Sequence, residues 1–173
     1  EKNLSYTGGN NVGIRYALNK GADIIILANN DIYIEDKQLI SKVVKTFQKY
    51  EDKIFILGLV VRFYNNRDII QEAGATFFYS EGDKVRLNGY ILNKVHPSDS
   101  IKYYDGASGA FLIVKRKVFK KIGLCDEKIY MYCDEKDFCY RAWVAGLQVA
   151  VDSSLKVYNK SSKLKNYINP YIS

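Results

Sequence analysis

The feature of this sequence that most constrains the fold is an apolar run that ends on a carboxylate. Residues 24–28 are five apolar residues in succession, several of them β-branched, and Asn29, Asn30 and Asp31 follow directly. A run without polar alternation is typical of a strand buried on both faces, as in parallel α/β sheets. Ligands bind at the carboxyl ends of such strands. We therefore expect Asp31 to lie at a ligand-binding edge.

The segment after this strand has two interpretations. Asn and Asp are turn-forming residues, so 29–31 can be a plain strand-to-loop turn. An Asn-x-Asp step also presents the oxygen ligands that a hard divalent cation takes, and such a cation can carry phosphates. Taken alone, the segment favours the turn interpretation. The other segments of the chain have to decide between a turn and a cation-binding step.

The rest of the chain predicts an α/β layered fold with a mixed, mostly parallel central sheet flanked by helices. Its length of 173 residues suits one domain. We expect one domain over 1–155 and a basic tail over 156–173. The predicted elements are helices at 8–20, 36–50, 115–122 and 134–146, strands at 54–61, 110–114 and 149–151, a hairpin at 75–92 and a loop at 93–104.

Net charge and cysteine usage bound the partners and the compartment. The net charge of +7 suits anionic partners, such as nucleotide phosphates, anionic lipids or nucleic acid, without selecting one. The three cysteines lack the spacing of a zinc site. We expect reduced thiols in a cytoplasmic protein that can contact the inner face of a membrane through its basic tail. No apolar run approaches the ~20 residues of a membrane span.

Two glycine-containing segments are candidate ligand contacts. Gly8, Gly9, Asn10 and Asn11 open a predicted helix, where glycines let a backbone approach a ligand and the helix N-terminus offers free N–H groups. The alternative is ordinary capping by Asn10.

The second segment lies just before the strand predicted at 110–114. Asp105, Ser108 and Gly109 belong to a run of small residues that can form a wall against a flat ligand. A loop whose glycines serve the backbone explains the run equally well.

A cluster of carboxylates begins the last predicted helix. Asp134 can be the N-cap, while Glu135 and Asp137 complement the helix macrodipole. Asp137 and Arg141 are also spaced as an i,i+4 ion pair. Capping leaves Glu135 free, and a carboxylate at a cleft is what a general base requires.

These segments, in this order, resemble the family 2 glycosyltransferases, in particular the rhamnosyltransferase-like branch of the GT-A fold. The family pattern joins a Gly-Gly-Asn-Asn helix start, an apolar strand ending in an Asn-x-Asp step, a Ser-Gly-Ala step and a carboxylate-headed helix. The matching segments here are 8–11, 29–31, 108–110, 115–127 and 132–141. The resemblance extends over about 3–162, and it implies that the first strand or strands of the fold precede Glu1.

The resemblance implies an inverting transfer of a sugar from a nucleotide-diphosphate sugar to a saccharide or lipid-linked acceptor. Asp31 then stands at the metal-binding position of a DxD-like motif, for Mg²⁺ or Mn²⁺, and Asn159 replaces a histidine that often helps to bind the metal. The donor or its sugar is expected near the remaining matched positions, which are Gly8, Gly9, Asn10, Asn11, Asn29, Asn30, Asp105, Ser108, Gly109, Asp137 and Arg141.

The family's Glu-Asp pair occurs here in reverse, as Asp134-Glu135. Position for position the general base is Glu135, and Asp134 stays a second candidate. The reversal, the asparagine at 159 and the absent first strand also motivate a rival, a domain that binds nucleotide or saccharide without turnover. A nucleic-acid-binding domain is a third hypothesis from charge and tyrosine content, but it lacks a recognised motif, and we do not expect nucleic acid as a partner.

Overall fold

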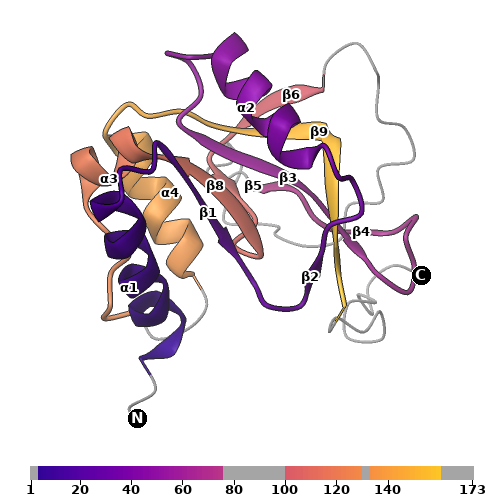
Figure 1. Cartoon of the computed structure of the whole chain (residues 1–173), viewed down its shortest axis with the longest axis horizontal. Helices are drawn as coiled ribbons and strands as arrows, with labels where there is room; N and C mark the ends of the chain where they lie inside the picture. Colours follow the sequence, from indigo (N-terminus) through magenta and orange to yellow (C-terminus); the bar gives the residue numbers. More distant parts are fainter. Residues whose placement is uncertain (1–3, 76–99, 130–132, 161–173) are drawn as a thin grey trace, which may run out of the picture.

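The computed structural model describes residues 4–75, 100–129 and 133–160, and Figure 1 shows a central sheet with helices around it. The helices are α1 (Ser5–Asn19), α2 (Leu39–Lys49), α3 (Arg116–Ile122) and α4 (Asp134–Val144). The strands are β1 (Ile24–Ala28), β2 (Ile32–Tyr33), β3 (Ile56–Phe63), β4 (Ile70–Glu72), β5 (Gly74–Ala75), β6 (Ile101–Tyr104), β7 (Gly106–Ala107), β8 (Phe111–Lys115) and β9 (Val149–Asn159).

The main sheet confirms the α/β class, but it is mostly antiparallel, so the predicted mostly parallel sheet was wrong. Its central path runs β1-β8-β3-β9-β2, with β4 added to β3 and β6 added to β9. Of these pairings between described strands, β3 with β9 is parallel, whereas the others are antiparallel. Strands β5 and β7 form a separate two-stranded ribbon.

The error has a physical cause. Strand β3 is buried along nearly its whole length, yet it has a parallel neighbour on one side and an antiparallel neighbour on the other. An apolar run reports burial, and it carries no information about the direction of the neighbouring strand. Because β1 and β8 are antiparallel, with Ala28 opposite Phe111, the turn that follows β1 lies beside the segment that precedes β8.

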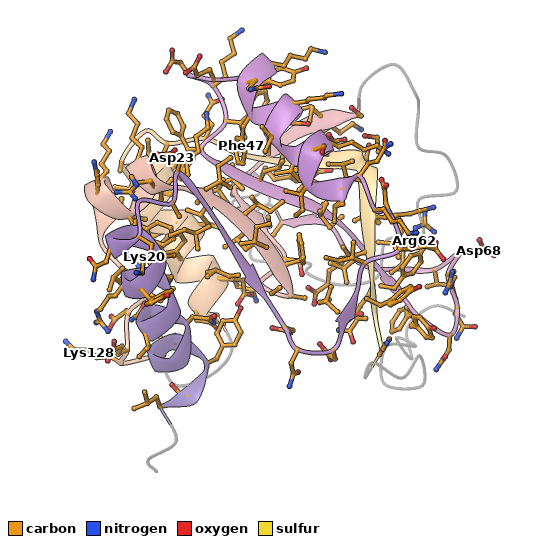
Figure 2. All side chains as sticks on the ribbon, in the orientation of Figure 1. Lys20, Asp23, Phe47, Arg62, Asp68 and Lys128 are labelled. Carbon is orange, nitrogen blue, oxygen red and sulfur yellow. The ribbon has the colours of Figure 1, made fainter. Side chains whose placement is uncertain are left out.

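Two hydrophobic clusters cover the two faces of the sheet. The first packs α1, α3 and α4 against a face that includes Ile25 and Leu27 of β1. The second packs α2 against the other face, through Leu39, Val43 and Phe47. Figure 2 labels Phe47 where α2 meets the sheet. Strand β1 packs on both faces as predicted, although its residues on the second face are only partly buried.

Two helix starts differ from the predicted positions. Helix α1 begins at Ser5 rather than at Gly8, so the glycines lie inside its first two turns. Helix α2 begins at Leu39, because Asp36 forms a turn in which its carboxylate accepts a hydrogen bond from the Gln38 N–H at 2.8 Å. Helix α2 contacts the sheet along a narrow stripe, since Ile40 and Val44 are exposed.

Strand β9 extends to Asn159 and therefore enters the segment expected to be a tail. Its pairing with β3 shifts register, from Leu59 opposite Asp152 to Val60 opposite Lys156. Buried Asp152 stabilises this bulge, because its carboxylate accepts hydrogen bonds from the backbone and hydroxyl of Ser154. The lysines of this segment, beginning with Lys156, are what predicted a basic tail.

Three further predictions concern the segment at 75–104, the cysteines and membrane-spanning segments. Residues 101–104 form β6 rather than the end of a loop, while most of the predicted hairpin, and His96, lie outside the described residues. The three cysteines are free thiols. No helix in the described ranges has the length and apolar character needed to span a bilayer.

Candidate functional site

The turn after β1 is fixed by its two neighbouring strands. The Asn29 N–H donates to the Ala110 carbonyl at 3.0 Å, and the Lys160 N–H donates to the Asp31 carbonyl at 3.0 Å. Strand β2, which follows the turn, pairs Ile32 with Asn159 of β9. The turn therefore brings Asp31 beside Asn159 and places Asn29 beside the segment before β8, while Asn30 is exposed.

The segment before β8 is the junction of four elements. The Ser108 hydroxyl donates to the Glu72 carboxylate at the end of β4. The Gly109 carbonyl accepts a hydrogen bond from the Tyr6 hydroxyl of α1 at 2.8 Å. A Cβ atom at Gly109 would lie 3.0 Å from the Glu135 Cβ of α4. Glycine at this position therefore allows the side chain of Glu135 to lie directly against the backbone.

The carboxylates of α4 lie where the sequence placed them, but the cap differs. The N-cap is Cys133, in the left-handed conformation at φ 64°, and Asp134 is the first residue of the helix. Burial raises the pKa of the Asp134 carboxyl. Burial likewise raises the pKa of Glu135, with smaller contributions from the charges of Asp134 and Glu72. A carboxylate with a raised pKa is a stronger base, which suits proton abstraction.

Figure 1 shows the starts of α1 and α4 and the β1–β2 connection on one side of the molecule. The hydrogen bonds above connect the same segments. These contacts link neighbouring segments in series, from Glu135 through Ser108 and Gly109 to Asn29, and from the same turn through Asp31 to Asn159.

The Gly-Gly-Asn-Asn segment is mostly engaged within the protein. The buried amide of Asn11 donates to the Cys125 carbonyl at 2.9 Å and to the Glu127 carboxylate at 2.9 Å, and it accepts from the Cys125 N–H at 3.1 Å. The Asn10 side chain lies beside the Tyr6 hydroxyl, whose pKa it lowers against the larger effect of burial. Gly8 is buried beside Leu4, whereas a Cβ added at Gly9 would meet no atom within 4 Å.

The predicted pair of Asp137 and Arg141 forms, with 2.8 Å between the guanidinium and the carboxylate. The same guanidinium donates to the carbonyls of Ile122 and Leu124. This network ties α4 to the end of α3, which is a structural role. Asp105 is half-buried, and its N–H donates to the Ala75 carbonyl, so it belongs to the ribbon that carries Ser108.

Sequence reasoning missed two residues of the junction, Tyr6 and Glu72. Tyr6 lies two residues before the glycines that the pattern highlighted, so its position in the first turn of α1 was a usable signal. Burial, followed by the charge of Asp134, raises the pKa of the Tyr6 hydroxyl. Glu72 is the last residue of the short strand β4, in an irregular part of the sequence, and nothing in the pattern around it distinguished it.

A cluster of tyrosines and cations, also unpredicted, flanks Asp31. The Arg67 guanidinium lies 5.1 Å from the ring centre of Tyr64 and 4.7 Å from that of Tyr158, and it pairs with Glu35 at 2.6 Å. The Lys160 ammonium lies 5.4 Å from the centre of the Tyr64 ring. Positive charge therefore lies next to the Asp31 turn, as an anionic ligand would require.

The side chain of Asp31 has the character of a cation ligand. Its Oδ1 atom is buried and accepts no hydrogen bond from the described residues. A buried carboxylate oxygen without a donor is costly unless a cation or another ligand satisfies it. The described part of the chain contains no group of three His, Cys, Asp or Glu side chains around one point. Mg²⁺ commonly binds through one or two carboxylates, with substrate phosphates and waters completing its shell, and Asp31 fits that pattern.

Comparison with known proteins shows that the chain is homologous to glycosyltransferases over 81% of its length, which confirms the predicted resemblance at that level. It is 30% identical over 141 residues to the low-salt glycan biosynthesis hexosyltransferase Agl10 of Haloferax volcanii, 43% of which is covered. It is 25% identical over 149 residues to the rhamnosyltransferase WbbL of Escherichia coli K12, 54% of which is covered. The chain thus spans about half the length of these curated relatives.

A solved structure supports the fold alone. The crystal structure of A197 from STIV superimposes with a TM-score of 0.51 at 14% identity, covering 86% of this chain and 63% of that one. No family model matches the chain.

Proposed function

We propose that this chain carries the transfer site of an inverting glycosyltransferase with GT-A architecture. Its substrates would be a nucleotide-diphosphate sugar and a hydroxyl of a saccharide or lipid-linked acceptor. One observation carries the proposal: the Ser108–Gly109 segment is next to both the Asp31 turn, through Ala110, and the Glu135 side chain. A candidate cation ligand and a candidate base thus flank one segment in a chain that is homologous to glycosyltransferases.

Asp31 would hold a Mg²⁺ or Mn²⁺ ion, and Asn159 beside it would offer its carbonyl oxygen as a further ligand. When bound, such a cation neutralises the charge that develops on the departing diphosphate. Lys160 and Arg67 would add positive charge on the same side. Asp31 supports this assignment because its buried Oδ1 has no donor among the described residues.

Glu135 would accept the proton of the acceptor hydroxyl. The acceptor oxygen forms a bond to the anomeric carbon of the sugar, the bond from that carbon to the diphosphate oxygen breaks, and the diphosphate leaves with the electron pair. A single displacement of this kind inverts the anomeric configuration. The raised pKa of Glu135 supports its role as base, and Asp134, also with a raised pKa, is the second candidate.

The names of the relatives suggest a hexose or a deoxyhexose such as rhamnose as the transferred sugar, and glycan assembly as the setting. The net charge of +7 is compatible with peripheral contact to an anionic membrane that holds a lipid-linked acceptor.

A second candidate function is binding of nucleotide or saccharide without turnover. The small number of metal ligands favours this function. Among the described residues, Asp31 does not belong to a group of three His, Cys, Asp or Glu side chains that could hold a metal ion. Product formation separates the two functions, since only an enzyme converts donor and acceptor.

Titration with UDP, dTDP and GDP, with and without Mn²⁺, tests the site directly. We expect at least one nucleotide to bind more tightly with Mn²⁺, and Asp31→Ala to remove that gain. Asp23→Asn is the matched control, because this exposed carboxylate lies at the α1–β1 connection (Figure 2). If no nucleotide binds the protein under either condition, the proposal is wrong in both its forms.

A further inference from the structure

Glu72 holds the Ser108 hydroxyl in a single orientation. The hydroxyl donates its one hydrogen to the Glu72 carboxylate, and its oxygen accepts the Ala110 N–H at 3.2 Å. A serine hydroxyl has one hydrogen to donate. Ser108 therefore has no further hydrogen for a substrate while Glu72 is in place, and its contacts are those of a structural anchor.

The backbone that Ser108 anchors is the surface against which Glu135 lies. Atoms Cβ, Cγ and Cδ of Glu135 lie 3.0, 3.2 and 3.4 Å from the position of a Cβ at Gly109. The Tyr6 hydroxyl donates a second hydrogen bond to this backbone, to the Gly109 carbonyl at 2.8 Å. A displacement of the Ser108–Gly109 backbone would therefore displace the carboxylate of Glu135.

We propose that Glu72 is a positioning residue for Glu135, which it orients through the Ser108–Gly109 backbone. The proposal rests on the proposed function, in which Glu135 is the general base. Glu72 acts in two ways. Its hydrogen bond fixes the backbone that Glu135 contacts, and its negative charge acts on Glu135 directly.

Several ionisable groups face Glu135 and define what a change at Glu72 can do. They are Tyr6 from α1, Glu72 from β4, and Asp134, Lys136 and Cys139 from α4 itself. Burial is the main cause of the raised pKa of Glu135, and the charges of Asp134 and then Glu72 add to it. Removing the charge of Glu72 therefore lowers the pKa of Glu135, so the base stays deprotonated to lower pH.

Two substitutions at position 72 separate the two actions. Glu72→Gln keeps an oxygen that can accept the Ser108 hydrogen bond but removes the charge. We expect it to retain most of kcat and to move the acidic limb of the kcat/KM profile to lower pH. Glu72→Ala removes the anchor as well, and we expect kcat to fall about tenfold or more, with the affinity for the nucleotide unchanged.

A double-mutant cycle tests whether the anchor is one unit. Ser108→Ala should lower kcat as Glu72→Ala does, and the double variant should be no worse than either single variant. Glu51→Ala is the matched control, since it removes an exposed glutamate, and it should leave kcat and the pH profile as in the wild type. Additive losses in the cycle, or a Glu72→Gln profile identical to that of the wild type, would overturn the proposal.

An NMR titration of the Glu135 carboxyl keeps the test separate from the proposed activity. We expect Glu72→Gln to lower the pKa of Glu135 relative to the wild type. If the wild-type protein transfers no sugar, the proposed function fails, but this measurement still decides whether Glu72 acts on Glu135. An unchanged Glu135 pKa in Glu72→Gln would refute the coupling between the two residues.

Discussion

Asn11 offers a sharp test, because its two possible roles predict opposite outcomes. Family resemblance makes it a donor-binding residue, whereas its buried amide is engaged with the 125–127 loop through three hydrogen bonds of 2.9–3.1 Å. Asn11→Ala would leave both backbone polar groups of buried Cys125 without these partners. The contact with Glu127 contributes less, since that carboxylate is exposed and also pairs with Arg15.

The magnitude follows from those two backbone groups. Each buried polar group left without a partner costs about 1–3 kcal/mol, so the loss of two such partners in Asn11→Ala should lower the free energy of unfolding by roughly 2–6 kcal/mol. Domains of this kind are stable by only about 5–15 kcal/mol. Urea denaturation should show the midpoint falling by about 1 M or more, given slopes of about 1–3 kcal/mol per M.

Two further variants make the Asn11 result interpretable. Asn11→Asp keeps the acceptor for the Cys125 N–H but faces the Cys125 carbonyl and the Glu127 carboxylate with a negative charge, so it should also destabilise. Asn19→Ala, at an exposed position of the same helix, should change stability by less than about 0.5 kcal/mol. A wild-type denaturation midpoint for Asn11→Ala, combined with loss of nucleotide binding, would refute the structural role.

Three other predictions concern packing, thiol reactivity and pH. Gly58→Ala should destabilise by about 1–3 kcal/mol in thermal or urea unfolding, because the new Cβ would lie 2.5 Å from the Ala107 Cβ; adding Ala107→Gly should recover much of the loss, and no recovery would contradict the contact. A thiol reagent should label exposed Cys133 fast and the two buried cysteines only on unfolding, since burial raises the pKa of Cys139 to about 12. Fast labelling of all three thiols in the folded protein would contradict this burial. Transfer should decline as pH falls through the pKa of Glu135, which lies above the ordinary glutamate value, and a decline that begins only at the ordinary value would count against Glu135 as base.

The sequence predicted the elements better than it predicted their pairing. The glycines at 123 and 146, both of which have positive φ, correctly marked the ends of α3 and α4, and the carboxylate cluster marked the start of α4. The direction of the neighbouring strands could not be predicted from the sequence. The apolar residues of β3 lie between a parallel neighbour and an antiparallel neighbour, and nothing in the run distinguishes the two. The second half of β9 was missed because a bulge held by buried Asp152 interrupts its apolar pattern.

In the candidate site, too, features with a local sequence pattern could be predicted, whereas features that depend on long-range contacts could not. Carboxylates that follow a strand or begin a helix carry a positional signal, so Asp31 and Glu135 could be selected from the sequence. Glu72 could not, because its importance comes from a contact with Ser108, 36 positions away in the chain. Asn11 carried a strong local pattern, yet its amide serves a contact 114 positions away, which no local pattern reveals.

The central claim is that Asp31 and Glu135 serve one sugar-transfer site, and a donor screen by product mass tests it most directly. The protein is incubated with a panel of nucleotide sugars, saccharide and lipid-linked acceptors, and Mg²⁺ or Mn²⁺, beside Asp31→Ala, Glu135→Gln and Asp134→Asn. We predict a glycosylated product whose formation requires the divalent cation and is lost in Asp31→Ala. Glu135→Gln should abolish transfer while nucleotide binding persists, and Asp134→Asn should have the smaller effect. Metal-dependent transfer that continues at the wild-type rate in both Asp31→Ala and Glu135→Gln would contradict the account.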